Sequence, residues 1–201
     1  MGLQPVTLAG RRVVLEPLAR EHRDALVAAV EDGRLWELWY TRVPDPAGMA
    51  AEVERRLALQ EAGSMLPFTV RRADTGVVVG MTTYMNVAMD DLRVEIGSTW
   101  TARSAQGTGV NAESQLLLLG HAFDVLGCAA VEFRTHWHNR QSREAIERLG
   151  AKQDGVLRRH TRMADGVWRD TVVYSVLDSE WPAVRNGLEH RLRRVGRPPG
   201  G

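Results

Sequence analysis

Cysteine is almost absent from this chain, and its scarcity excludes two kinds of site. The 201 residues contain a single cysteine, Cys128, so neither an intramolecular disulfide nor a cysteine-based metal cluster is available. Cys128 stands between a helix-like run and a strand-like run, where a lone cysteine is far more often a small core residue than a nucleophile. We therefore expect Cys128 to be buried and to take no part in chemistry.

An excess of charge of one sign is also lacking. Lys and Arg number 26 against 25 Asp and Glu, a formal net charge of +1, so net charge implies neither nucleic acid nor an acidic membrane surface as a partner. No apolar run approaches membrane-spanning length, and residues 1–9 lack the charged start and long apolar core of a secretory signal. We therefore expect a cytoplasmic protein that binds neither nucleic acid nor membrane.

What the chain does contain suits one compact enzyme domain. With 44% apolar residues in a chain of this length, a single domain can bury a substantial core, and a division into two is not needed. We expect one domain over residues 1–201 with its core at about 8–192. Residues 195–201 hold two prolines and three glycines and are expected to form a loose tail.

The spacing of apolar residues predicts an α/β (α+β) fold. The expected strands are residues 12–18, 66–72, 77–86, 92–100 and 129–137, followed by two strands that meet at Asp165-Gly166. The expected helices are residues 20–30, 47–62, 114–126, 141–149 and 186–194, with a short helical turn at 35–40. Asp-Gly between alternating runs is a hairpin signal, and the three strands between 66 and 100 are spaced for antiparallel hairpins.

The most informative stretch is the glycine loop, Gln106-Gly107-Thr108-Gly109-Val110-Asn111-Ala112-Glu113, which lies between a strand-like run and a strongly helical one. Glycines let backbone N–H groups turn inward, and the start of a helix adds unpaired N–H groups and a positive dipole end. Such a loop can bind an anionic pyrophosphate without a metal or a lysine. The alternative is an ordinary glycine-rich turn before a helix.

Two classes of cofactor fit the glycine loop. Gly107, Gly109 and Ala112 satisfy a dinucleotide fingerprint, and Glu132 lies about twenty residues further on, where an acid for the ribose is expected. The context disfavours this class, because residues 101–106 intervene between strand and loop, whereas a dinucleotide fold turns directly after its strand. Hairpins precede the loop, and too little chain follows Glu132 for further crossover units.

The second class rests on a resemblance. Gln106-x-x-Gly109-x-Asn111 resembles the Gln/Arg-x-x-Gly-x-Gly/Ala loop of the acyl-CoA-dependent N-acetyltransferases of the GNAT superfamily, except in the last place. Residues 139–151, with Asn139, Ser142 and Leu149-Gly150, resemble the superfamily's Asn-x-x-Ser/Ala…Leu-Gly-Phe segment. Residues 154–181 look like the RimJ/RimL branch. The resemblance covers about residues 8–192 and is strongest after residue 95.

The resemblance implies a GNAT fold and a mode of cofactor binding. It implies a mixed, mainly antiparallel central sheet flanked by helices, in which the fourth and fifth strands run parallel and splay apart, with pantetheine in the gap. The cofactor would be acetyl-CoA, with no metal. The implied cofactor-binding residues are Trp100, Thr101, Gln106, Gly107, Thr108, Gly109, Val110, Asn111, Asn139 and Ser142. For Asn139 and Ser142 a helix cap is an equally good interpretation.

One carboxylate is the candidate for catalysis. Glu95, midway along the strand at 92–100, resembles the glutamate that serves as base in histone acetyltransferases of the superfamily. A carboxylate inside an apolar strand tends to have a raised pKa, which suits base catalysis near neutral pH. The alternative is a solvent-facing residue or one paired with an arginine. The tyrosine that many members use as acid is absent, because Ile146 stands there, so the leaving group takes its proton from water or from another group.

Aromatic residues and histidines mark a candidate acceptor site. The candidates are Trp36, Tyr40, His136 and His138, with Trp39 between the first two; residues 36–40 correspond to a region that borders the acceptor cleft in related proteins. His136 and His138 project to the same side of a strand, but no companion pattern names a third metal ligand, so we expect no metal. A polar strand face is the plain interpretation of this alternation.

The predicted function is acetyl transfer from acetyl-CoA to an amine acceptor by direct attack on the thioester. The acceptor is a protein N-terminus or a small amine, and the residues do not choose between them. The sequence also leaves open a longer acyl donor and a homodimer. Asn111 and Ile146 depart from the family pattern and keep a CoA-binding sensor without turnover as an alternative. A dinucleotide-binding protein is the less favoured one.

Overall fold

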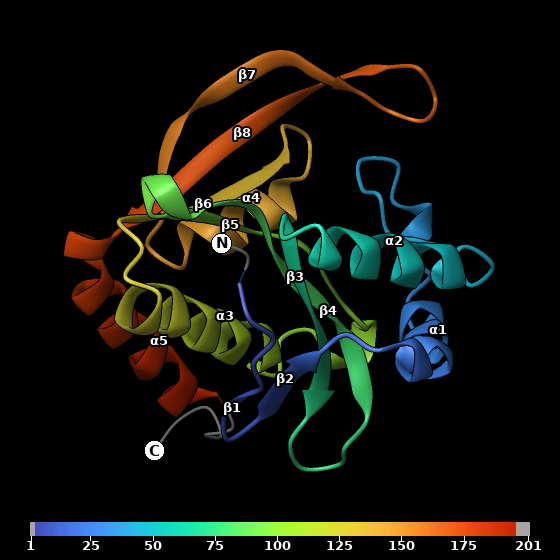
Figure 1. The fold of residues 1–201 in the computed structure, drawn as a ribbon, viewed down its shortest axis with the longest axis horizontal. Coiled ribbons are helices and arrows are strands. Elements are labelled where there is room, and N and C mark those ends of the chain that lie inside the picture. Colours follow the sequence, from blue (N-terminus) through green and yellow to red (C-terminus); the bar gives the residue numbers. More distant parts are fainter. Residues whose placement is uncertain (1–2, 196–201) are drawn as a thin grey trace.

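A computed structural model describes residues 3–195, which build a sheet of eight strands in the order β1-β2-β3-β4-β5-β6-β8-β7 (Figure 1). The strands are β1 (Leu8–Ala9), β2 (Val13–Pro17), β3 (Met65–Arg72), β4 (Val78–Ala88), β5 (Arg93–Thr101), β6 (Ala130–His136), β7 (Lys152–Arg162) and β8 (Trp168–Leu177). The helices are α1 (Arg23–Glu31), α2 (Met49–Glu61), α3 (Val110–Gly120), α4 (Arg140–Glu147) and α5 (Trp181–Arg194).

Helices cover both faces of the sheet, as two adjacent residues of β4 show. The Tyr84 hydroxyl donates to the carbonyl of Leu118 in α3 at 2.5 Å. The neighbouring Thr83 accepts a hydrogen bond from Arg56 of α2 at 2.6 Å. Because successive residues of a strand point to opposite faces, α3 lies on one face and α2 on the other. Tyr84 is fully buried, so the α3 face is part of the main hydrophobic core.

The sheet is mainly antiparallel with one parallel pair, as the resemblance implied. Strands β5 and β6 pair in parallel only from Arg93 with Ala130 to Glu95 with Glu132. Beyond Glu95, β5 continues to Thr101 and pairs only with β4, while β6 pairs with β8. The parallel strands therefore splay apart after Glu95, which confirms the predicted fold.

Most predicted elements are present, and the differences lie at their ends. Strand β1 was not predicted, because two residues are too short to show a period. Helix α3 begins earlier than residue 114, at Val110, and continues after Gly120 as a turn of π-helix. Helix α5 begins at Trp181 rather than 186, with Pro182 in its first turn, where proline is favoured. Of the tail predicted at 195–201, residues 196–201 lie outside the described residues.

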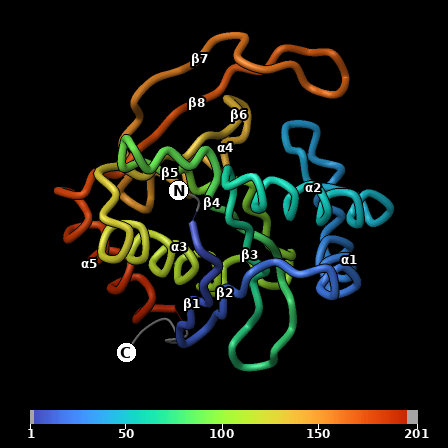
Figure 2. Tube along the Cα trace, in the orientation of Figure 1, coloured from blue at the N-terminus to red at the C-terminus, as the bar shows by residue number. Residues whose placement is uncertain are grey.

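The hairpin formed by β7 and β8 extends past the end of β6, and the loop between α1 and α2 extends toward this hairpin (Figure 2). The contact is specific, since Arg42 of the loop donates from Nη2 to the carbonyl of Arg162 on the hairpin at 2.9 Å. Residues from the first quarter of the chain are thus placed beside residues from its last quarter, over one end of the sheet.

Candidate active site

The glycine loop adopts the conformation that a phosphate-binding turn requires. Gly107 and Gly109 both have positive φ, at 76° and 92°, a region that residues with side chains enter at a cost. Gly109 is the residue that caps α3, and no side chain caps the helix there. The backbone turn is therefore set by the two glycines, and the first turn of α3 is left open to a partner from outside the chain.

The backbone N–H groups from Gly107 through Ala112 donate to no acceptor within residues 3–195. The next N–H group, that of Glu113, makes the first helical bond, to the carbonyl of Gly109 at 2.9 Å. Ala112 is buried, and buried N–H groups are almost always paired. A run of free N–H groups at the positive end of a helix fits a pyrophosphate, so the residues present suit coenzyme A.

Two side chains hold the glycine loop in place rather than pointing out of it. Gln106 donates from Nε2 to the carbonyl of Thr101, the last residue of β5, at 3.0 Å. The hydroxyl of Thr108 donates to the carbonyl of Ala105 at 2.6 Å. These bonds tie the loop to the end of β5, so the loop position follows the strand. Asn111, the second residue of α3, is half-buried, and its side chain makes no such hydrogen bond within the described residues.

Trp100 is buried beside this strand end, and its indole Nε1 has no hydrogen-bond partner within the described residues. A buried indole N–H without an acceptor is uncommon. Trp100 is one residue before Thr101, in the part of β5 that no longer pairs with β6. An acceptor supplied from outside the chain would satisfy it.

A residue that the sequence did not single out, Arg12, packs against the glycine loop. A Cβ placed on Gly109 would lie 3.3 Å from Cδ of Arg12 and 3.3 Å from Cγ1 of Val195. The backbone N–H groups of Arg12 and Val13 in turn donate to the carboxylate of Glu113, at 2.6 and 2.9 Å. These contacts span about a hundred residues of sequence, so no local pattern could have predicted them.

Asn139 and Ser142, predicted as cofactor contacts, take part in a helix cap. Asn139 precedes α4, and its side-chain Oδ1 accepts a hydrogen bond from the backbone N–H of Ser142 at 3.0 Å. Such a cap satisfies one of the unpaired N–H groups at the start of the helix. The cap leaves the amide nitrogen of Asn139 and the hydroxyl of Ser142 free within the described residues, so a role in cofactor binding stays a prediction.

Glu95 lies at the last parallel pair before the strands splay, and the residue is only 4% exposed. Asn86 donates from Nδ2 to Oε2 of Glu95 at 2.6 Å, and Nε of Arg134 lies 3.5 Å from the same oxygen. Burial raises the pKa of Glu95 above its ordinary value, while Asn86 and Arg134 partly oppose the rise. The arginine pairing and the raised pKa, both considered from the sequence, therefore coexist.

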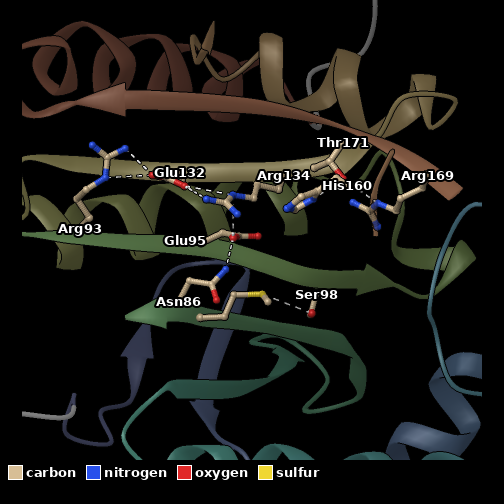
Figure 3. Close-up of polar contacts among 10 residues, drawn as sticks. Asn86, Arg93, Glu95, Ser98, Glu132, Arg134, His160, Arg169 and Thr171 are labelled. Atoms are coloured by element: carbon tan, nitrogen blue, oxygen red, sulfur yellow. Dashed lines mark hydrogen bonds and ion pairs between the residues drawn. The ribbon is translucent and has the colours of Figure 1, made fainter. Parts of the chain in front are cut away.

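Glu95 belongs to a polar strip on the α2 face of β5, β6 and β8 (Figure 3). Residues that pair across strands or alternate along one strand share a face. By that rule the polar strip consists of Glu95, Glu132, Arg134, His136, Thr171 and Arg169. Its carboxylates are bridged by Arg134, whose Nη2 lies 2.9 Å from Oε2 of Glu132. Arg93 binds the other oxygen of Glu132. Burial raises the pKa of that carboxyl, but Arg93 and Arg134 together outweigh burial and lower it.

Room for the Glu95 carboxylate exists because residue 97 is glycine. A Cβ on Gly97 would lie 2.9 Å from Oε1 of Glu95 and 2.7 Å from Sδ of Met85. We expect Gly97→Ala to leave stability almost unchanged, because both obstructing atoms end flexible side chains and can move. The displaced carboxylate should lower acetyl transfer roughly tenfold, the scale of a small misplacement of a reacting group. Steady-state rates and a melting curve on one preparation test this, and full activity would show that the position of Glu95 is not critical.

The predicted acceptor residues separate into two groups. Trp39 lies against both His136 and His138, with ring centroids 5.4 and 5.6 Å apart, and Tyr40 packs edge-on against Trp39. Trp36 instead packs against the hydrophobic core. Trp39 is 61% exposed, so the aromatic ring that covers the histidines also faces solvent. The sequence predicted that residues 36–40 border the acceptor site, but only the folded structure shows that Trp39 is the tryptophan in contact with the histidines.

His136 is buried at the end of β6 and is held as a neutral ring. Its Nδ1 accepts the backbone N–H of His138 at 3.0 Å, a bond that requires an unprotonated Nδ1. Burial lowers the pKa of His136, and the nearby charges of Arg169 and His138 lower it further. His136 is thus suited to hold its neighbours in position as a neutral ring rather than to act as an acid.

Within residues 3–195, no cluster of three His, Cys, Asp or Glu side chains is arranged to hold a metal ion. Over the same residues, no helix is long and apolar enough to cross a membrane. Cys128 is buried, as expected.

Comparison with known proteins decides the family. The model of the acetyltransferase (GNAT) domain matches residues 12–152, more than half of the chain. The chain belongs to this family. No curated protein matches it. The structure of a GCN5-related N-acetyltransferase from Brucella melitensis is 30% identical, with a TM-score of 0.86 over 99% of this chain and 90% of that one.

The RimJ/RimL likeness inferred from the sequence is confirmed. Mycobacterium smegmatis RimJ, solved in complex with CoA-disulfide, is 25% identical, with a TM-score of 0.79 over 93% of this chain and 95% of RimJ. RimL, described as a ribosomal L7/L12 alpha-N-protein acetyltransferase, shares the fold with a TM-score of 0.75 at 16% identity, over 87% of this chain and 96% of RimL. GNAT acetyltransferases use acetyl-CoA.

Proposed function

We propose that this GNAT protein transfers an acetyl group from acetyl-CoA to an amine, with Glu95 as the general base. The observation that carries the proposal is the arrangement along β5. The strand holds a buried carboxylate where it separates from β6, and its far end leads into a loop with a run of free N–H groups. A donor anchored at the loop and lying along the released strand edge would bring its thioester toward Glu95.

The residues divide the work between anchoring and proton transfer. Acetyl-CoA, when bound, supplies an acetyl thioester as the electrophile. The N–H groups of the glycine loop would hold the pyrophosphate, and Trp100 and Thr101 would offer polar atoms to the pantetheine chain. Oε2 of Glu95 is occupied by Asn86 and Arg134, whereas Oε1 accepts no hydrogen bond within the described residues. Oε1 is therefore the atom we assign to accept the amine proton.

The raised pKa of Glu95 suits this role, because a base works best when its pKa approaches the working pH. Departure of the thiolate needs a proton as well. Ile146, which stands where many GNAT members have a tyrosine, is a buried apolar residue on α4. We therefore assign the proton for the leaving thiolate to water.

The acceptor is either a protein N-terminus or a small amine. RimL, a protein with the same fold, is described as a ribosomal L7/L12 alpha-N-protein acetyltransferase, which makes protein N-termini a natural first class to test. Trp39, Tyr40, His136 and His138, at the end of the polar strip, are the residues we propose to contact it.

Thermal denaturation gives a direct test of the donor. We expect CoA and acetyl-CoA to raise the melting temperature by roughly 5–10 °C at about a hundredfold excess over Kd, since a ligand selective for the folded state stabilises it by mass action. NAD, which suits the alternative fingerprint, should have almost no effect. Equal stabilisation by NAD would overturn the assignment of the glycine loop to CoA.

Turnover separates an enzyme from a sensor. Release of free thiol from acetyl-CoA should require an added amine, and a panel of short peptides with free N-termini and small amines would identify the productive class. Stabilisation by CoA without turnover across that panel would favour the CoA-binding sensor.

A further inference from the structure

The far end of the polar strip carries a positive charge that the proposed chemistry does not use. Arg169 lies on β8 beyond the last residue that pairs with β6, His136 with Thr171. It is half-buried, and its Nε donates to the hydroxyl of Thr171 at 3.0 Å. Within residues 3–195 no carboxylate lies within ion-pair distance of Arg169 and its terminal nitrogens have no acceptor. A partly desolvated guanidinium without an acidic partner is unusual.

Two residues from other segments lie close to Arg169, and one of them is a second arginine. Ring Nδ1 of His160, on β7, lies 3.1 Å from the same Thr171 hydroxyl, so Thr171 holds the arginine and the histidine side by side (Figure 3). Arg42, brought in by the loop between α1 and α2, is close enough to lower the pKa of Arg169, after the larger effect of burial. The same loop is fixed to the hairpin through Arg42 and Arg162.

Glu95 lies within electrostatic reach of Arg169 on the same face. The charge of Arg169 opposes the rise in the pKa of Glu95, and Glu95 opposes the fall in the pKa of Arg169. Glu95 already has Asn86 and Arg134 as close partners, whereas Arg169 has only a neutral hydroxyl. The polar strip therefore presents a base at one end and an unneutralised cation at the other.

From this arrangement we infer that the acceptor amine carries a carboxylate, and that Arg169, supported by Thr171, His160 and Arg42, is the residue that binds it. The inference rests on the proposed function, since it places the acceptor amine at Glu95. An arginine binds a carboxylate through two parallel N–H bonds, which the free terminal nitrogens of Arg169 can offer. Free acidic amino acids and peptides with an acidic residue near the N-terminus share this chemistry.

The experiment compares acceptors that differ only in the charged group. The pairs are aspartate with asparagine and glutamate with glutamine, each as the amino acid whose α-carboxylate is blocked as an amide and as the first or second residue of a short, C-terminally amidated peptide, so that the side-chain carboxylate is the group that differs. Binding to the protein–CoA complex is measured by calorimetry, and acetylation by thiol release. The parent should bind and acetylate the acidic member of at least one pair about ten- to a hundredfold better than its amide. The blocked amino acids and the amidated peptides distinguish the two sources of the carboxylate.

Arg169→Gln should remove that preference, because glutamine keeps a donor for Thr171 but loses the charge. We expect KM for the acidic acceptor to rise about ten- to a hundredfold, with little change in KM for acetyl-CoA or for the amide acceptor. The matched control is Arg158→Gln. Arg158 lies on the same hairpin but pairs with Asp170 on the opposite face, so the preference for acidic acceptors should remain.

Failure of the inference is distinct from failure of the proposed function. Equal binding of the acidic and amide members in the parent, or no binding of any acidic member to the CoA complex, would overturn the inference even if other amines are acetylated. An equal loss for both members in Arg169→Gln would overturn it as well, since that result indicates a structural role. Absence of CoA binding or of transfer to any amine would instead count against the proposed function.

Discussion

Glu95→Gln is expected to lower acetyl transfer on the order of a hundredfold or more, the usual scale for loss of a positioned base, while CoA affinity stays near that of the parent. Glutamine retains the size of the side chain and an oxygen that can accept from Asn86, but it cannot take the amine proton. Glu95 lies at the start of the splay, away from the free N–H groups of the glycine loop, so cofactor binding should be spared. Steady-state rates and calorimetry with CoA measure the two effects separately.

The pH dependence gives a second measure of the same substitution. In the parent the rate should rise with pH through one ionisation, at a pH above the ordinary range for glutamate, because burial raises the pKa of Glu95. Glu95→Gln should lose that feature. Nearly full turnover in the variant at neutral pH would mean that Glu95 is structural and that the protein works by positioning an already neutral amine.

Stability is the control for this variant, and its sign follows from the raised pKa. A carboxyl whose pKa is higher in the folded chain than in the unfolded chain contributes stability below its unfolded pKa, and that contribution is lost as pH rises through the folded pKa. Above that range the parent has a buried charge that Glu95→Gln lacks. The melting temperature of the variant should therefore gain on that of the parent as pH rises, so a loss of activity there is not a loss of folding.

Local patterns predicted the elements of the fold and the glycine loop. The strands alternate over enough residues to show their period, and Gly107 and Gly109 stand where only a positive φ closes the turn. Local patterns did not predict the order of the strands in the sheet. The parallel pairing of β5 with β6 came from the family resemblance, because residues of β5 carry no local mark of the partner they will meet more than thirty residues later.

The candidate site was predicted only in part, for the same physical reason. Glu95 was chosen through the family resemblance and the histidines through the alternation of their own strand, but the partners of both come from other segments. Asn86 holds Glu95 from β4, and Trp39 covers His136 from the loop before α2. Arg169 carries no motif at all, and its isolation from acids is a property of the folded chain. Long-range partners of this kind require the structure.

The glycine loop itself is the other place where a large effect is expected. Gly109→Val should weaken CoA binding on the order of a hundredfold, the cost of losing one or two charge-assisted hydrogen bonds. At a φ of 92° a β-branched residue is strongly disfavoured, and the new Cβ would lie 3.3 Å from both Arg12 and Val195. The loop would have to turn away, and its N–H groups would no longer converge on one anion. Calorimetry with CoA measures the loss.

Two companion variants make this prediction specific. Gly109→Asn should fall between the parent and Gly109→Val, because asparagine tolerates a positive φ better than valine does. Asn111→Gly, in the first turn of α3, should change CoA affinity only a few-fold, since the family pattern accepts glycine there and the cost is about 0.5–1 kcal/mol of helix stability. If Gly109→Val folds with a normal melting curve and binds CoA as the parent does, the pyrophosphate site lies elsewhere. A complete loss of binding in Asn111→Gly would show that the asparagine side chain, rather than the backbone alone, holds the anion.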